Sequence, residues 1–389
     1  MPSKAKRLDN LPEYVFAVIS KKVRQMQLDG IDIVRMDIGS PDLPPDTFVM
    51  DALDESTRKS SHHGYSGYQG IPRFREAVSR YYKKRFEVEL DSETEVLPLI
   101  GSKEGIVNLT LAYLDSGDSV LVPAIGYPSY AMGALLAGAT VHYVDMPEEN
   151  GFIMDLESID EAVAKEAKIL WCNYPNNPTG AVADIDFYTK AVAFCKKCDI
   201  LLASDNPYCD VTYDGYRAPS ALQVAGAKDT TVEFMSLSKT FNMAGWRLGA
   251  AVGSKEALKN LLHVKSNVDS GHFIPAYDAG ISAMDNTTDD WLATRNAIYQ
   301  ARRDIIVNNL DDIGLSAITP KASLYIWAKV KDMPALEYIE MARQHAHVSL
   351  APGAAYGPGG DEYIRMSVTI TEDRLQEGIN RLKKWYSNR

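Results

Sequence analysis

Residues 168–205, KILWCNYPNNPTGAVADIDFYTKAVAFCKKCDILLASD, contain a complete strand–helix–strand pattern. An apolar run rich in β-formers (168–175) is followed by a stretch of Asn, Pro, Thr and Gly that is typical of a loop. Apolar residues then recur at helical spacing over 185–197, and the run at 199–205 again resembles a buried strand. This order predicts two parallel strands joined by a helix.

The same alternation continues on both sides of this unit. Apolar runs at 96–101, 119–124 and 140–146 precede it, and runs at 231–238 and 248–253 follow it. Helical segments separate most of these runs. The sequence therefore predicts an α/β protein whose large domain has a mostly parallel sheet flanked by helices.

The carboxyl-terminal part of the chain has a different pattern. A long helical stretch at 289–314 precedes apolar runs at 324–330 and 363–368, with a second helical stretch at 333–346 between them. We expect a smaller α+β domain here. The predicted limits are an amino-terminal arm joining the small domain (1–45), a large domain (46–280) and the small domain (281–389).

Composition limits the classes of partner. The 389 residues are 46% hydrophobic and 24% charged, and 41 basic against 52 acidic residues give a net charge of −11. This charge disfavours nucleic acid and anionic membranes as partners. No stretch resembles a signal peptide or a membrane span of about 20 apolar residues. With only four cysteines in a chain of this length, a cytoplasmic location is expected.

Two groups of potential metal ligands are better explained without a metal. Cys195 and Cys198 form a C-x-x-C, but they lie in a helical segment with no second ligand pair after it. His62 and His63 lie in a turn-rich stretch without acidic or cysteine co-ligands, so solvated loop residues are the favoured interpretation. No metal site is predicted.

Unusual polar residues follow several of the predicted strands. Ligands of parallel α/β sheets bind at the carboxyl ends of the strands, so these residues are candidates for one site. They are Gly101, Ser102, Asn177, Asp205, Tyr208, Ser236, Ser238, Lys239 and Arg247. Taken singly, each is more often a turn or capping residue than part of a site.

Taken together, their chemical types complement pyridoxal phosphate. This cofactor needs an amine for its aldehyde, a carboxylate for its ring nitrogen, donors to its phenolate oxygen and a cationic cradle for its phosphate. Lys239 lies in SLSKTFNMAGWRLG (236–249) among small and polar residues. A lysine that must react with an aldehyde works better when partly desolvated than as a hydrated surface ammonium.

Several motifs also resemble those of one known family. YPNNPTG, DNPY, SLSKTFNMAGWRLG and a late YIRMS resemble, in order and approximate spacing, the motifs of the class I aminotransferases, which are fold type I pyridoxal-phosphate enzymes. The resemblance covers nearly the whole chain. It implies a homodimer with shared active sites and transfer of an amino group between an amino acid and a 2-oxo acid.

The resemblance also implies roles for the candidate residues. Lys239 would bind the cofactor covalently and transfer protons, Asp205 would hold the ring nitrogen, and Tyr208 and Asn177 would donate to the phenolate oxygen. The phosphate would be bound by Gly101, Ser102, Lys103, Ser236, Ser238 and Arg247.

Four further residues receive roles only from the resemblance. Tyr127 would stack on the cofactor ring, and Tyr65 would reach the phosphate of the neighbouring subunit. Arg365 would bind the substrate α-carboxylate beside Gly39. Core packing for Tyr127, a surface charge for Lys103 and a structural ion pair for Arg365 remain open alternatives.

The substrate is the least determined feature. GSKEG (101–105) and PSYAMGALLAGA (128–139) resemble the LL-diaminopimelate aminotransferase branch more than the aspartate or aromatic branches. Lys103 or Glu104 would then contact the far end of the substrate. Aspartate, alanine or aromatic amino acids with 2-oxoglutarate remain alternatives, as does a C–S lyase of the same fold. A DNA-binding regulator and a thiol or metal enzyme are disfavoured.

Overall fold

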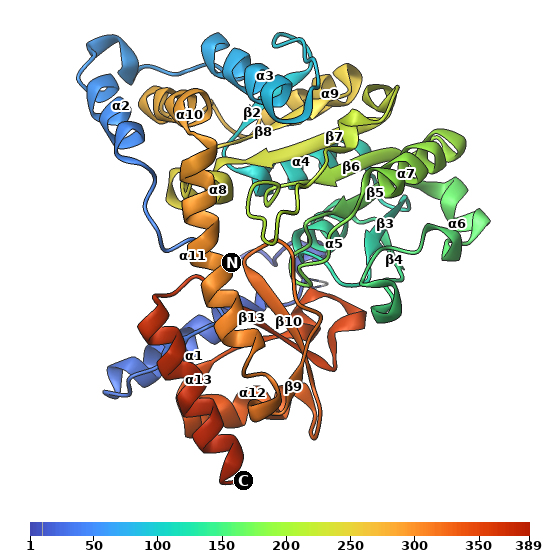
Figure 1. Cartoon of the computed structure of the whole chain (residues 1–389). Coiled ribbons are helices and arrows are strands. Elements are labelled where there is room, and N and C mark those ends of the chain that lie inside the picture. Colours follow the sequence, from blue (N-terminus) through green and yellow to red (C-terminus); the bar gives the residue numbers. More distant parts are fainter. Residues whose placement is uncertain (10) are drawn as a thin grey trace.

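A seven-stranded sheet lies at the centre of the larger part of the molecule (Figure 1). The structure is a computed structural model that describes residues 1–9 and 11–389, so Asn10 of the predicted arm lies outside the described residues. The sheet order is β2-β8-β7-β6-β5-β3-β4. The strands are β2 (Val96–Leu99), β3 (Ser119–Pro123), β4 (Thr140–Val144), β5 (Ala167–Asn173), β6 (Leu201–Asp205), β7 (Thr231–Ser236) and β8 (Gly249–Gly253).

The sheet is covered by helices on both faces, which confirms the predicted α/β class. Alternate residues of the strands enter two separate apolar cores, as strands buried on both sides require. One face packs on α4 (Ser102–Tyr113), α5 (Ser129–Ala137) and α9 (Lys255–Lys265). The other packs on α3 (Pro72–Phe86), α7 (Ile185–Cys198) and α10 (Ile274–Asn286).

Strand directions bring the candidate loops to one edge of the sheet. Only β8 is antiparallel to its neighbours, whereas the other six strands run in the same direction. The carboxyl ends of those six strands therefore lie at the same edge as the start of β8. This is why Arg247, which precedes β8, can share a site with residues that follow other strands.

The smaller part is built on a four-stranded antiparallel sheet with order β12-β13-β10-β9. Its strands are β9 (Leu315–Ser316), β10 (Tyr325–Val330), β12 (Ala351–Pro352) and β13 (Tyr363–Ser367), and its helices include α12 (Ala335–Met341) and α13 (Glu372–Ser387). The amino-terminal strand β1 (Val34–Arg35) pairs with β11 (Val348–Ser349) and adds Val34 and Met36 to this core. The domain limits themselves stay a prediction.

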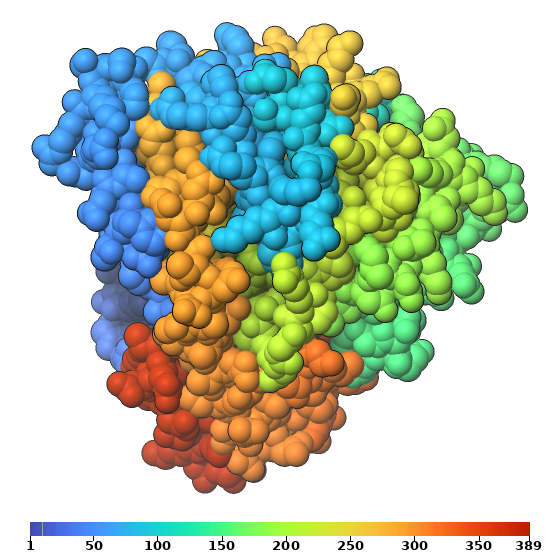
Figure 2. Space-filling model, turned by 45° about the horizontal axis from the view of Figure 1, so that its top comes forward, coloured from blue at the N-terminus to red at the C-terminus, as the bar shows by residue number. Residues whose placement is uncertain are grey.

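Helix α11 (Asp289–Val307) runs between the two parts (Figure 1). In the space-filling view, its orange surface continues downward from α10 and meets the red carboxyl-terminal segment (Figure 2). The remaining α-helices are α1 (Val15–Leu28), α2 (Thr47–Thr57), α6 (Glu161–Glu166) and the single turn α8 (Leu237–Thr240). Helix α2 packs against α10.

The potential metal ligands lie in ordinary structural surroundings. Cys195 is buried and Cys198 half-buried on α7, and neither forms a disulfide. The interpretation of His62 as a solvated residue is wrong: its side chain is 18% exposed, with Nδ1 at 2.8 Å from Ser56 Oγ. Within residues 1–9 and 11–389, no cluster of three or more His, Cys, Asp or Glu side chains could hold a metal ion. Across the same residues, no helix combines the length and apolar character needed to cross a membrane.

Candidate active site

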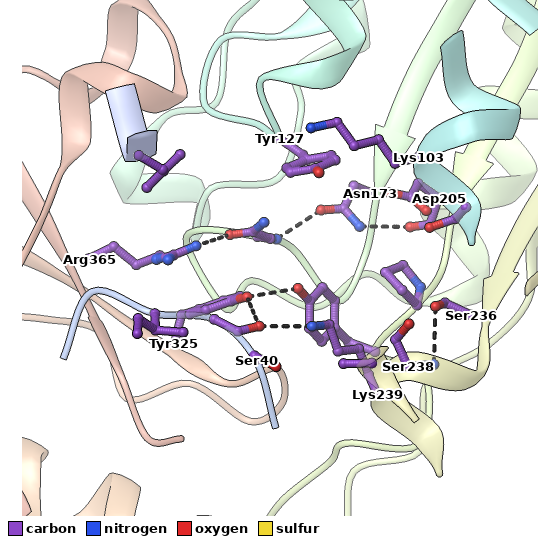
Figure 3. A pocket seen from close by; sticks show the side chains of 18 of the residues that line it. Ser40, Lys103, Tyr127, Asn173, Asp205, Ser236, Ser238, Lys239, Tyr325 and Arg365 are labelled. Carbon is purple, nitrogen blue, oxygen red and sulfur yellow. Dashed lines mark hydrogen bonds between the residues drawn. The ribbon is translucent and has the colours of Figure 1, made fainter. Parts of the chain in front are cut away.

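A cavity of about 380 Å³ lies at the carboxyl edge of the large sheet, where it meets the smaller part (Figure 3). Twelve of the fourteen predicted site residues line it. They are Gly39, Ser102, Lys103, Tyr127, Asn177, Asp205, Tyr208, Ser236, Ser238, Lys239, Arg247 and Arg365. Residues that are up to 326 positions apart in the sequence thus form one chemical environment.

Lys239 is a desolvated amine. Its Nζ donates to the carbonyl oxygen of Gly39 at 2.8 Å. Burial, together with the positive charges of Arg365 and Arg247, lowers the pKa of this lysine to about 7. A large share of Lys239 is therefore neutral near pH 7, which gives it the free electron pair that a nucleophilic or basic amine needs.

Asp205 is a buried carboxylate with one free oxygen. The Tyr130 hydroxyl donates to Oδ2 at 2.6 Å, whereas Oδ1 has no partner among the described residues. The pKa of Asp205 is raised to about 7, because the effect of burial, with a smaller contribution from the Glu233 carboxylate, outweighs the opposing hydrogen bond from Tyr130. A buried oxygen without a donor is costly, so Oδ1 is arranged to receive one from a ligand.

Aromatic side chains also line the cavity. The Tyr208 hydroxyl lies 3.0 Å from that of Tyr325, which also donates to Gly39 O at 3.3 Å. Gly39 must lack a side chain, because a Cβ there would overlap the Tyr325 ring. The Tyr127 ring, labelled in Figure 3, also lines the cavity.

One end of the cavity is built for an anion. Helix α4 begins at Ser102, so its first amide groups point toward this end. Ser236, Ser238 and Arg247 line the same cavity. Gly101 does not line the cavity. A Cβ at Gly101 would overlap the Arg247 guanidinium, so the lack of a side chain at this position leaves room for Arg247. Arg247 has a φ of 56°, an uncommon conformation for a residue other than glycine.

Arg365 forms the opposite end. Its Nη1 donates to Asn177 Oδ1 at 3.0 Å and its Nη2 to the carbonyl of Asp37 at 2.8 Å, while Nε has no partner in the described part of the chain. The guanidinium lies 4.0 Å from the centre of the Tyr325 ring. Arg365 lies on β13, so the smaller part of the molecule supplies this cation.

Two of the predicted contacts are not made within this chain. Tyr65 is 90% exposed and lies outside the cavity. The suggestion that Glu104 contacts substrate is wrong, because Glu104 does not line the cavity. Its carboxylate instead accepts hydrogen bonds from Ile100 N and Asn108 Nδ2 and lies 3.8 Å from Lys265 Nζ.

Sequence reasoning missed further residues of the site, among them Asn173, Tyr130 and Tyr325. Asn173, at the end of β5, donates to Asp205 O at 2.7 Å and accepts from Asn177 N at 2.8 Å. A polar residue at the end of a buried strand was a usable signal for it. Tyr130 and Tyr325 gave no such signal, because tyrosines in apolar segments usually belong to the core.

Comparison with known proteins identifies the class that this fold and site define. Residues 31–382 match the family described as aminotransferase class I and II. The LL-diaminopimelate aminotransferase of Moorella thermoacetica is 43% identical, over 98% of this chain and 97% of that protein. The LL-diaminopimelate aminotransferase of Aquifex aeolicus is 42% identical, over 97% of each.

Solved structures agree with this result. Apo-BacF from Bacillus subtilis is 34% identical, with a TM-score of 0.95 over 99% of both chains. A probable N-succinyldiaminopimelate aminotransferase from Thermus thermophilus is 35% identical, with a TM-score of 0.90 over 95% of this chain and all of that one. The chain therefore belongs to the class I and II aminotransferases, whose members depend on pyridoxal phosphate, and it is an enzyme of amino-acid metabolism.

Proposed function

We propose that the cavity holds pyridoxal 5′-phosphate and that the enzyme transfers the amino group of LL-diaminopimelate to 2-oxoglutarate. One observation carries the cofactor assignment: a desolvated amine and a buried carboxylate with a free oxygen face the same cavity. Free Oδ1 of Asp205 suits a protonated ring nitrogen, and Lys239 suits an aldehyde. The residues present therefore fit the group.

The anionic end of the cofactor has a matching place. Phosphate is stabilised by amide groups at a helix N-terminus together with hydroxyl and guanidinium donors. Ser102 at the start of α4 supplies the first kind, and Ser236, Ser238 and Arg247 supply the second. Lys103, in the same turn, adds positive charge, while Tyr127 lines the cavity where the cofactor ring would stack.

The chain's own residues have separate tasks in the reaction. When bound, the cofactor supplies an aldehyde that takes up the amino group and a ring that accepts electrons. Lys239 Nζ would take the proton from the α-carbon of the amino-acid substrate and, in the reverse half of the exchange, give a proton to the α-carbon of the product amino acid. Asp205 would stabilise positive charge on the ring nitrogen, and Tyr208 and Asn177 would donate to the phenolate oxygen.

Arg365 is proposed to bind the α-carboxylate of both substrates, next to Gly39. In Arg365→Lys the charge remains but the planar pair of donors is lost. We expect the KM values for amino acid and oxo acid to rise together, by about tenfold or more. Steady-state kinetics with each substrate varied in turn measure this. A loss confined to one of the two would instead assign Arg365 to a side-chain pocket.

The substrate assignment rests on the relatives named above and on Lys103. The Lys103 ammonium lies 4.8 Å from the Tyr14 ring centre and 5.9 Å from that of Tyr127, and in the described structure it forms no salt bridge. A cation at the cavity that lacks a carboxylate partner can bind the distal carboxylate of a long, doubly charged amino acid.

A panel of amino donors with 2-oxoglutarate tests the assignment. We expect kcat/KM for LL-diaminopimelate to exceed that for aspartate, alanine and phenylalanine by at least about tenfold, which corresponds to roughly 1.4 kcal/mol. Preference for any of those three would overturn the substrate and leave the aminotransferase class intact.

We also propose a homodimer with shared active sites. Tyr65 supports it, because a ring that is 90% exposed in one subunit is available to reach the phosphate site of a second. Mixing inactive Lys239→Ala and inactive Tyr65→Ala subunits should then restore part of the activity in hybrid dimers. Sedimentation of the purified enzyme as an active monomer would contradict this arrangement.

A cytoplasmic location remains part of the proposal, supported by four cysteines without disulfides.

A further inference from the structure

Arg295, on α11, is a buried cation that contacts the backbone around Lys239. Its side chain is 3% exposed. Nη1 donates to the carbonyl oxygens of Lys239 and Thr240 at 2.8 and 2.5 Å, and Nη2 donates to the carbonyl of Asp210 at 2.6 Å. All three acceptors are backbone oxygens, so the two Nη atoms of Arg295 bind the main chain and no acidic side chain.

These carbonyls need an external donor because α8 is a single turn. The last four carbonyl groups of a helix have no partner within it. In a longer helix, the amide of Met243 would bond the Lys239 carbonyl, but here it donates to Leu237 O at 3.4 Å. Arg295 supplies the missing donor, and a charged donor in a buried place makes a strong bond.

The guanidinium of Arg295 is itself fixed in orientation. Its Nε donates to Asn296 Oδ1 at 3.0 Å, and Asn296 Nδ2 donates to the carbonyl of Asp210 at 2.9 Å. The guanidinium also lies 5.5 Å from the ring centre of Trp291. Asp210 belongs to the segment that follows Asp205, the last residue of β6, and that also carries Tyr208. Arg295 thus joins that segment to the turn carrying Lys239.

Helix α11 is anchored at its other end as well. Arg302 donates to Val368 O at 3.1 Å and Arg303 to Pro320 O at 2.9 Å, both in the smaller part of the molecule. Figures 1 and 2 show the helix extending from the large sheet toward that part. The hydrogen bonds of Arg295 to Lys239 and Thr240 therefore lie where α11 meets α8, the turn that carries Lys239.

We propose that Arg295 is a positioning residue for Lys239: by holding the carbonyls of Lys239 and Thr240 it fixes the turn from which Lys239 reaches the cavity. This keeps Nζ beside Gly39 and away from water. The consequence for turnover rests on the proposed function of Lys239, but the structural part does not. It can be measured on the protein without cofactor or substrate.

The test compares Arg295→Lys with Arg303→Lys. Both arginines are 3% exposed on the same helix, but Arg303 bonds Pro320 O and Asp214 instead of the catalytic turn. In each apoprotein, acylation of Lys239 by acetic anhydride is followed against pH by mass spectrometry of its peptide. The charged groups that lower the pKa of Lys239, Arg365 and Arg247, are present in every variant.

The native midpoint should lie near pH 7. In Arg295→Lys the loosened turn admits water to Nζ, so the midpoint should rise by about one pH unit, toward the value of a solvated lysine. Arg303→Lys should leave it within about 0.3 units. In the loaded enzyme, kcat should fall about tenfold or more for Arg295→Lys while KM changes little.

Equal midpoints in the two variants would overturn the proposal, whatever their thermal stability. If Arg295→Lys fails to fold, Asn296→Ala replaces it, because this change removes the acceptor that orients the guanidinium. The midpoint should then rise by a smaller amount, and an unchanged midpoint would equally count against Arg295. If the panel of amino donors contradicted the proposed substrate, the positioning role of Arg295 measured by the acylation midpoint would be unaffected.

Discussion

Replacing Lys239 with alanine is expected to remove turnover, by at least about 10⁴-fold, while the fold is retained. The structure gives the reason: the amine of Lys239 lies in the cavity, has no carboxylate partner among the described residues and has a pKa of about 7. No other amine in the cavity shares these properties, since Lys103, the second lysine lining it, is exposed. Turnover of the variant with 2-oxoglutarate measures the loss of activity, and its far-ultraviolet circular dichroism shows whether the fold is retained.

A covalent label makes this prediction sharper. The purified enzyme should be yellow, and borohydride reduction should leave the cofactor attached to the peptide holding Lys239. Lys265 is the control, because it is more deeply buried, at 1% exposed, but is paired with Asp269 at 2.8 and 2.6 Å. Mapping the label to Lys265, or to any lysine except Lys239, would sink the assignment.

Lys239 also sets a pH dependence. Only the neutral amine reacts with an aldehyde, and burial places its pKa at about 7. Uptake of pyridoxal phosphate by the apoprotein should therefore slow as the pH falls below 7 and reach a plateau above it. For a solvated lysine, whose pKa is near 10.4, the rate would still rise between pH 8 and 10.

The arrangement of the strands and the edge that carries the site could be predicted from local signals. Runs such as 168–175 and 199–205 are apolar enough to be buried on both faces. Polar residues such as Asp205 and Lys239 lie at the end of a strand or within a few residues of it. Parallel strands then bring those residues together by geometry alone. The structure confirms this part of the prediction.

Contacts between distant segments could not be predicted in this way. The Tyr325 ring packs against Arg365 and its hydroxyl lies by Tyr208, yet in the sequence it is one more apolar residue of a strand. Arg295 looks like any charged residue of an amphipathic helix until the helix is placed against α8. Such roles depend on the packing of segments, which periodicity and spacing do not encode.

Tyr130, beside Asp205, shows the same limit. Three residues after Tyr127, it was not singled out, although its hydroxyl gives Asp205 a hydrogen bond at 2.6 Å. Its ring stacks on Trp171 at 4.9 Å between ring centres, and Trp171 in turn packs on Phe234. This aromatic stack fixes Oδ2, so Oδ1 is the oxygen left without a partner among the described residues.

Asp205→Ala should lower kcat by two to three orders of magnitude, because a preorganised electrostatic partner worth roughly 3 to 4 kcal/mol is lost. Burial is the main cause that raises the pKa of this carboxyl to about 7. A positively charged ring nitrogen would favour the ionised form again, so the carboxylate and the cofactor stabilise each other's charge. Weaker retention of pyridoxal phosphate should accompany the lower kcat.

Two further variants separate charge from structure in this prediction. Asp205→Glu keeps a carboxylate and should recover part of the lost kcat. Asp118→Ala is the control. Asp118 immediately precedes β3, at the opposite edge of the sheet, and pairs with Lys168 at 2.7 Å. The kcat of this variant should equal that of the native enzyme. If kcat of Asp205→Ala stayed within a factor of about three of the native value, the free oxygen would not be the partner of the ring nitrogen. The buried carboxyl would then stabilise the fold alone, and equilibrium dialysis of the variant would show pyridoxal phosphate bound as tightly as before.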